Sequence, residues 1–161
     1  MDNLKLLLIS VLFLLVGIIM IPFTIYYSNT TVYSNHFHLS LSDLGGSTVS
    51  YKGSTGDKVI ICGYSTSSIK IIVLNPPLGG IYLGQFNGNF TTSFDATPFK
   101  QIVIEGGNYP ANVTASIETY NTNFSGIGYT IAGIFLVLGL ILLWYSYALS
   151  LNKSKIHKSK L

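Results

Sequence analysis

The feature that most constrains this chain is an uncharged apolar segment near its C-terminus, from Ile127 to Leu149. About 20 such residues in a helix cross the hydrocarbon core of a bilayer. A basic tail without acidic residues follows, with Lys153, Lys155, Lys158 and Lys160. Aromatic residues suited to a membrane interface precede this tail: Trp144, Tyr145 and Tyr147. Lysine-rich flanks stay on the cytoplasmic side. The pattern therefore predicts a transmembrane helix over residues 126–150 and a cytoplasmic tail over 151–161.

A second uncharged apolar segment, Leu6–Tyr27, lies near the other end of the chain. It is longer than the roughly 7–15 apolar residues of a secretory signal peptide, and no small-residue cleavage site follows it. We therefore expect an uncleaved transmembrane helix over 6–27 after a cytoplasmic segment 1–5, with a cleaved signal peptide as the alternative. With two crossings, both termini are cytoplasmic and residues 28–125 lie outside the cell membrane.

Small residues recur along one face of each apolar segment. In a membrane, such faces let helices approach closely, because lipid gives two apolar helices no hydrophobic reason to pair. One interpretation is that the two faces meet in an antiparallel hairpin. Alternatives are packing against a separate subunit, or the ordinary abundance of small residues in membrane helices. The residues are Ser10, Gly17 and Thr24 in the first helix, and Gly128, Ala132 and Gly139 in the second.

Between the apolar segments the sequence alternates apolar and polar residues, as Phe37 and Leu39 do with His36 and His38. This period is typical of half-buried strands. Glycine- and proline-rich turns separate the runs. We therefore predict a mainly β fold, an extracellular antiparallel β-sandwich of about eight strands flanked by two transmembrane α-helices. The predicted strands are 36–41, 48–52, 58–64, 69–74, 80–83, 90–94, 99–105 and 112–120.

The outer segment carries few charges, four lysines against five acidic residues, and the chain has no arginine. Without guanidinium groups, recognition of phosphates or bases is not expected, so we predict no nucleic-acid partner. No catalytic motif, cofactor-binding motif or small-molecule substrate is indicated. The chain is therefore expected not to be an enzyme, unless it is a subunit of a larger membrane enzyme.

His36 and His38 share one strand face and are weak candidates for a metal site, although two ordinary solvent-facing histidines explain the pattern better. Cys62, the only cysteine, lies in an apolar run. There it is expected to be a small buried hydrophobe. An intermolecular disulfide or a functional thiol are the alternatives.

Four N-glycosylation acceptor sequences lie in the outer segment, at Asn29, Asn89, Asn112 and Asn123. A fifth match, at Asn152, falls in the predicted cytoplasmic tail and should stay unmodified.

The weakly charged, arginine-free outer segment, rich in Ile, Tyr, Ser, Thr and Asn, resembles cell-surface proteins of thermoacidophilic archaea. The segment from Phe99 through Gly106-Gly-Asn-Tyr-Pro110 to Tyr120 is loosely similar to the end of GOLD-type sandwiches. These resemblances concern composition and topology, and they imply an acid-facing β-sandwich. They imply nothing about activity.

We therefore expect a membrane-anchored cell-surface protein with a structural or interaction role, held in the lipid bilayer and binding a protein of the membrane or envelope. One alternative is an accessory subunit of a membrane-bound respiratory or redox complex. A second is a membrane protein of an archaeal virus.

Overall fold

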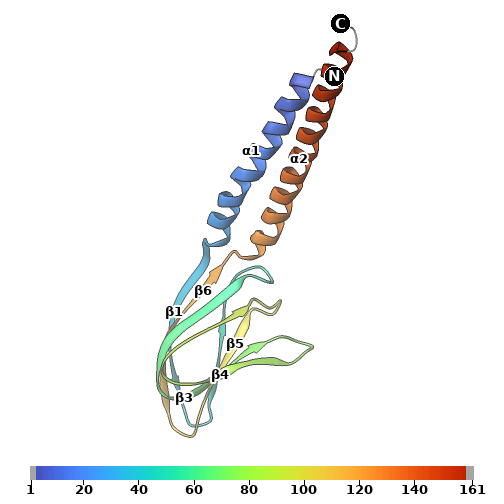
Figure 1. The fold of residues 1–161 in the computed structure, drawn as a ribbon. Helices are drawn as coiled ribbons and strands as arrows, with labels where there is room; N and C mark the ends of the chain where they lie inside the picture. Colours follow the sequence, from blue (N-terminus) through green and yellow to red (C-terminus); the bar gives the residue numbers. More distant parts are fainter. Residues whose placement is uncertain (1–2, 159–161) are drawn as a thin grey trace. The chain divides into compact units, whose positions relative to one another are not determined.

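The computed structural model describes residues 3–158, with side chains described as far as Leu151. It consists of two compact units. One is a pair of long helices, α1 (Asn3–Ser28) and α2 (Asn123–Lys158) (Figure 1). The other is a β domain of six strands, β1 (Thr31–Leu41), β2 (Gly46–Ser50), β3 (Lys58–Leu74), β4 (Gly80–Asp95), β5 (Gln101–Gly106) and β6 (Ala111–Tyr120).

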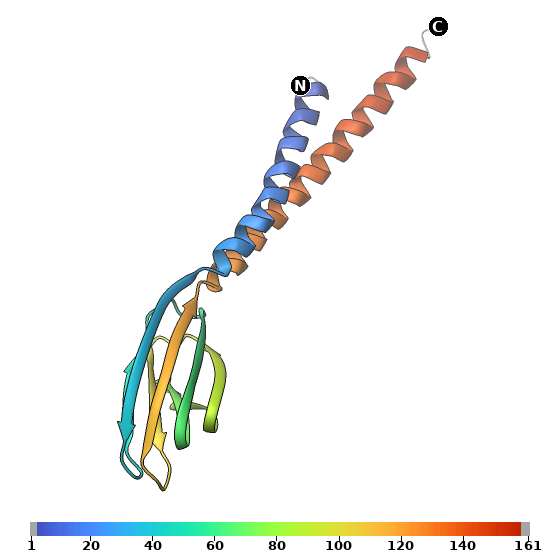
Figure 2. The same cartoon turned by 90° about the vertical axis from the view of Figure 1, so that its left-hand side faces the viewer.

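The strands form one continuous, nearly closed antiparallel sheet. β6 pairs with β1 on one edge and with the first half of β3 on the other, and Figure 2 shows β1 and β6 running side by side. β5 pairs with β2 and with the second half of β3. β4 pairs with β3 along nearly its whole length. The sheet therefore has two halves that share the long hairpin β3–β4.

The two halves meet where three segments leave the regular ladder together. The backbone N–H of Leu44 donates to the carbonyl of Gly107 at 2.9 Å, and Gly106 N–H donates to Gly45 at 2.7 Å. Gly107 N–H in turn donates to the carbonyl of Ser68 at 2.9 Å. These bonds satisfy backbone groups that the interrupted ladders leave open. We call this region, made of residues 42–45, 66–68 and 106–110, the bend.

The predicted mainly β fold with two long helices is confirmed. The predicted sandwich is not confirmed, because the strands form one nearly closed sheet, and the predicted number of strands is wrong. In the described residues, the runs 58–64 and 69–74 belong to the single strand β3, and the runs 80–83 and 90–94 belong to β4. Gly84 and Gly88 have positive φ angles of 148° and 84°, yet the chain does not reverse at either. Glycine in a strand often marks a bulge, and here it does so instead of forming a turn.

The core lies on the inner face of the sheet and is built from alternate residues of its strands. Both halves of β3 contribute, with Ile61 on one side of the bend and Ile71 on the other, each fully buried. Gly63, opposite Ala115 on β6, shows how closely these strands approach. A Cβ atom there would lie 2.6 Å from the carbonyl oxygen of Thr114.

A buried polar lock ties the loop after β2 to the loop after β4. The backbone N–H of Thr97 donates to the Tyr51 hydroxyl at 2.9 Å, and the Thr97 hydroxyl donates to the carbonyl of Leu74 at 2.9 Å. The Tyr51 hydroxyl lies 3.2 Å from Thr97 Oγ1, to which it therefore donates. The Tyr51 ring also packs edge-on against Phe94, with a centroid distance of 5.5 Å.

We predict that Tyr51→Phe destabilises the β domain by about 1–3 kcal/mol, because it leaves the buried N–H of Thr97 without an acceptor. Thermal unfolding of the full chain in mild detergent, followed by circular dichroism, measures the effect. Tyr64→Phe is the matched control, since Tyr64 is 50% exposed on the outer face. Equal stability of the two variants would show that the lock contributes nothing.

Candidate functional site

Both helices are long and apolar enough to cross a membrane, and only 17% of each apolar window is buried. Large apolar side chains point away from the helix pair, among them Leu12 and Ile19 on α1 and Val137 and Ile141 on α2. Exposing such an apolar surface to water is unfavourable, whereas contact with equally apolar lipid chains is not. The helix pair is therefore compatible with a two-span membrane protein.

The small residues lie where the two helices meet. Ser10, Gly17, Thr24, Gly128, Ala132 and Gly139 are all buried. A Cβ atom on Gly17 would lie 2.7 Å from Leu136 Cγ and 3.1 Å from the carbonyl oxygen of Ala132. At Gly139 a Cβ atom would meet the backbone nitrogen of Leu14 at 3.0 Å. The faces of α1 and α2 that carry the small residues thus contact each other within this unit.

The buried hydroxyl groups on α1 are satisfied within their own helix. Ser10 donates to the carbonyl of Leu7 and Thr24 to that of Met20, both at 2.7 Å. Such bonds remove the cost of placing a hydroxyl among apolar side chains. The rings of Phe13 and Phe135 pack edge to face across the pair at 5.5 Å.

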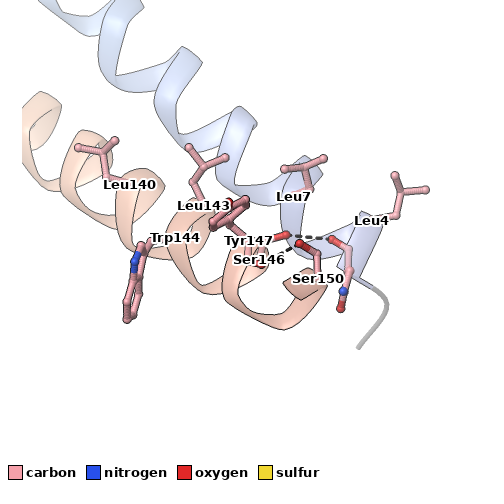
Figure 3. A pocket seen from close by; sticks show the side chains of 9 residues that line it. Leu4, Leu7, Leu140, Leu143, Trp144, Ser146, Tyr147 and Ser150 are labelled. Atoms are coloured by element: carbon pink, nitrogen blue, oxygen red, sulfur yellow. Dashed lines mark hydrogen bonds between the residues drawn. The ribbon is translucent and has the colours of Figure 1, made fainter. Parts of the chain in front are cut away.

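The helix pair also contains a groove of about 740 Å³, close to the beginning of α1 (Figure 3). Its walls are mostly apolar surface from both helices, and Asn3, Ser146 and Ser150 add small polar side chains. We call it the apolar groove; it is lined by Leu4, Leu7, Leu140, Leu143, Trp144 and Tyr147 together with Asn3, Ser146 and Ser150.

The β domain has a smaller cleft of about 360 Å³ at the bend. Leu44 and Tyr109 line it although their side chains are 77% and 74% exposed. Polar side chains complete the lining, and Gln85 Nε2 donates to Ser68 Oγ at 2.6 Å. We call it the bend cleft; it is lined by Leu44, Ser68, Lys70, Gln85, Gly106, Gly107, Asn108 and Tyr109.

Sequence patterns did not identify the bend cleft, because its residues come from four separate segments of the chain, at positions 44, 68–70, 85 and 106–109. A signal was nevertheless present. Leu44 directly precedes Gly45-Gly46, and Tyr109 stands between Asn108 and Pro110. A large apolar residue inside a turn segment cannot be buried by strand alternation, so it is a candidate contact residue.

The two histidines lie on the outer face of β1, and both are exposed. His38 Nδ1 is 2.8 Å from Thr114 Oγ1 on β6. Within residues 3–158, no group of three His, Cys, Asp or Glu residues could hold a metal ion. The arrangement gives His36 and His38 no third ligand.

Cys62 is exposed, so the expectation that it is buried was wrong. Val59 and Ile61 face the core and are fully buried, and alternation places Cys62 on the outside. There its sulfur accepts a weak hydrogen bond from the Thr91 hydroxyl at 3.6 Å. The error arose because β3 carries apolar residues on both faces of its first half, so the run does not show which residues are inside.

All four asparagines of the acceptor sequences in the outer segment are exposed. Asn112 Oδ1 accepts a hydrogen bond from the Ser40 hydroxyl at 2.9 Å. Asn123 also contributes through its backbone, whose N–H donates to Asp57 Oδ1 at 3.3 Å. Asn152 lies beyond the described side chains.

Asp57 is buried, and its carboxylate holds the end of the domain where β3 begins. Besides the Asn123 N–H, it accepts the backbone N–H of Ser54 at 2.6 Å. Nearby on β6, the Tyr120 hydroxyl donates to Glu118 at 2.6 Å, and this bond is the main reason why the pKa of Tyr120 is raised. Through these hydrogen bonds, both carboxylates stabilise the local structure.

No protein-family model matches the chain, and no curated protein matches it. Several solved structures are similar to part of the chain. A mutant of the family 29 carbohydrate-binding module CBM29-2 is 14% identical, covering 59% of this chain and 78% of that one with a TM-score of 0.39. Another family 29 module is 13% identical, with coverages of 59% and 75% and a TM-score of 0.40. A de novo designed double-stranded β-helix is 12% identical, with coverages of 52% and 97% and a TM-score of 0.37.

We predict that Gly17→Leu weakens the pairing of α1 and α2 by about 1–2 kcal/mol, because the new side chain must displace Leu136 and the α2 backbone. Gly133→Leu is the control, since nothing lies within 4 Å of a Cβ atom there. Pairing is measured as the yield of a short bismaleimide cross-link between cysteines replacing Phe13 and Phe135, with Cys62 changed to serine. If both variants cross-link as well as the parent, the small-residue face does not hold the pair together.

Proposed function

We propose that this chain is a two-span membrane protein that displays its β domain on the outer side of the cell membrane and binds another protein there. The observation that carries the proposal is the inverted surface of the helix pair. Its small residues are inside and its large apolar residues are outside, as expected for helices in lipid. The β domain, in contrast, buries a core of large apolar residues, as expected for a domain in water.

The orientation rests on the charges that follow the apolar part of α2 in the sequence. The lysines after Leu151 are retained on the cytoplasmic side, and Trp144 and Tyr147, both exposed, suit the inner interface. In the sequence, the β domain connects the end of α1 to the beginning of α2, which are the helix ends away from the lysines. It then lies outside. Exposed Asn89 and Asn112 are the favoured glycan carriers in a host with N-glycosylation, and Asn152 stays unmodified.

The bend cleft is the proposed contact site for the protein partner. Tyr109 and Leu44 offer exposed apolar surface beside amide and ammonium groups, a mixture typical of binding sites. None of the residues that line the cleft is His, Cys, Asp or Glu. Acid–base chemistry therefore has no titratable carboxylate or imidazole to use there, so we propose binding instead of catalysis.

Cys62 provides a test of the topology, because it is the only cysteine and it is exposed on the β domain. We predict that a membrane-impermeant maleimide labels Cys62 on intact cells. The matched control replaces Cys62 by serine and Ser154 by cysteine, which moves the thiol to the tail. This variant should be labelled only after the cells are permeabilised. Labelling of the tail thiol on intact cells would overturn the proposed orientation.

A photo-crosslinking residue in place of Tyr109 tests the partner. We predict that it forms a defined protein adduct in native membranes, and that Leu44→Ser, across the bend cleft, reduces the adduct yield severalfold. The same crosslinker in place of Leu78, which is 85% exposed outside the cleft, should form none. Absence of an adduct from Tyr109, or equal yields from both positions, would contradict the contact site. Mass spectrometry of the adduct separates an envelope protein from a redox-complex subunit.

A further inference from the structure

We propose that the apolar groove binds one hydrocarbon chain of an anionic membrane lipid from the cytoplasmic leaflet. The inference rests on the proposed membrane placement and adds to it a lipid site of defined composition. Three observations support it: the length of the groove, its gradient of polarity, and the basic residues that follow its lining in the sequence.

The length of the groove matches one leaflet. Along α2 its lining runs from Leu140 to Ser150, which is about 15 Å at the rise of an α-helix. The hydrocarbon core of a bilayer is about 30 Å thick, so one leaflet contributes about half of it. The volume of about 740 Å³ lies in the range of roughly 300–1,000 Å³ found for ligand pockets.

The groove is apolar at one end and polar at the other. Leu140, Leu143 and Leu7 form the end deeper in the proposed membrane. Asn3, Ser146 and Ser150 lie toward the beginning of α1, as Figure 3 shows for the two serines. The Ser146 hydroxyl donates to the backbone carbonyl of Asn3 at 3.4 Å, and the Ser150 hydroxyl donates to the backbone carbonyl of Tyr147 at 2.7 Å. A lipid chain lying in the groove would thus have its polar end beside polar groups.

The charges favour an anionic headgroup. α2 continues beyond Ser150 to Lys158, and this last part of the helix carries Lys153 and Lys155 as well. Asp2 is the only acidic residue in either terminal segment of the sequence. Basic residues near a membrane surface attract anionic lipids. Charge complementarity therefore favours such a lipid over a second copy of this chain, whose corresponding helix ends would bring lysines beside lysines.

Trp144, the only tryptophan, lines the groove and reports its occupant. The full chain is reconstituted in vesicles of phosphatidylcholine containing a minor share of phosphatidylglycerol, with brominated chains on one lipid or the other. Bromine quenches tryptophan fluorescence on contact. We expect phosphatidylglycerol to quench severalfold more than its mole fraction predicts, because the groove keeps a chain of this lipid in contact with Trp144.

Leu7→Phe, which narrows the groove, should reduce this preference to the mole fractions. Leu8→Phe, the same change on the 61% exposed neighbour, should keep it. Leu143→Phe narrows the groove from the α2 side. It is used instead of Leu7→Phe if the Leu7→Phe variant does not insert into the vesicles. If the preference for phosphatidylglycerol persists in both groove variants, the lysines alone cause it, and the proposal is overturned. Equal quenching by both lipids, with a dimer that Leu7→Phe dissociates, would assign the groove to a second copy of the chain.

The two proposals fail differently. If Trp144 is quenched by neither brominated lipid, the helices are not in the bilayer, and the proposed membrane placement fails with the lipid site. If both lipids quench in proportion to their mole fractions, the placement stands and only the lipid site is wrong.

Discussion

The β domain depends on the change of neighbour along one edge of β3. Residues 58–65 pair with β6 and residues 69–73 with β5, so the ladder must be released between them. The polar groups freed there find other partners: the Thr66 hydroxyl accepts the backbone N–H of Asn112 at 2.9 Å, and the Ser67 hydroxyl donates to the carbonyl of Pro110 at 2.9 Å. These hydrogen bonds replace part of the ladder bonding that the sheet loses where it bends. The bend in turn lets Ile61 and Ile71, on opposite sides of it, join one core.

The helix pair solves a different problem with the opposite residues. In water, burial of large apolar side chains drives packing, as it does for the isoleucines of the β domain. For helices in lipid, burying a leucine gives no hydrophobic free energy, because the lipid chains are equally apolar. Close backbone approach and van der Waals contact must therefore hold the helices together. Gly17 against Ala132 and Gly139 against Leu14 provide that approach. Where the lining residues are larger, toward the beginning of α1, the pair leaves the apolar groove instead.

Sequence patterns predicted the local features well, because these depend on neighbours in the chain. Alternation placed Phe37 and Leu39 inward and His36 and His38 outward, and charge and length identified both apolar helices. Patterns failed where the outcome depends on distant partners. Asn87-Gly88 has the composition of a turn, but pairing with β3 keeps β4 continuous through it. Cys62 was misplaced because its run is apolar on both faces. The bend cleft could not be predicted as a site, since the pairing of β3 with β5 and β6 is what assembles its lining.

The sheet also affects the helices through the connectivity of the chain. The pairing of β1 with β6 begins at Thr31 opposite Tyr120, and Asn121 N–H extends it by donating to the carbonyl of Thr30 at 3.1 Å. Antiparallel partners have Cα atoms about 4.5–5.5 Å apart. Since α1 ends at Ser28 and α2 begins at Asn123, the folded sheet holds these two helix ends close together, whatever the orientation of the two units. Bringing the two helices together has an entropic cost of loop closure, and folding of the β domain offsets this cost. A face of small residues with a modest contact energy is enough to complete the pair, because the helices meet at a high effective concentration.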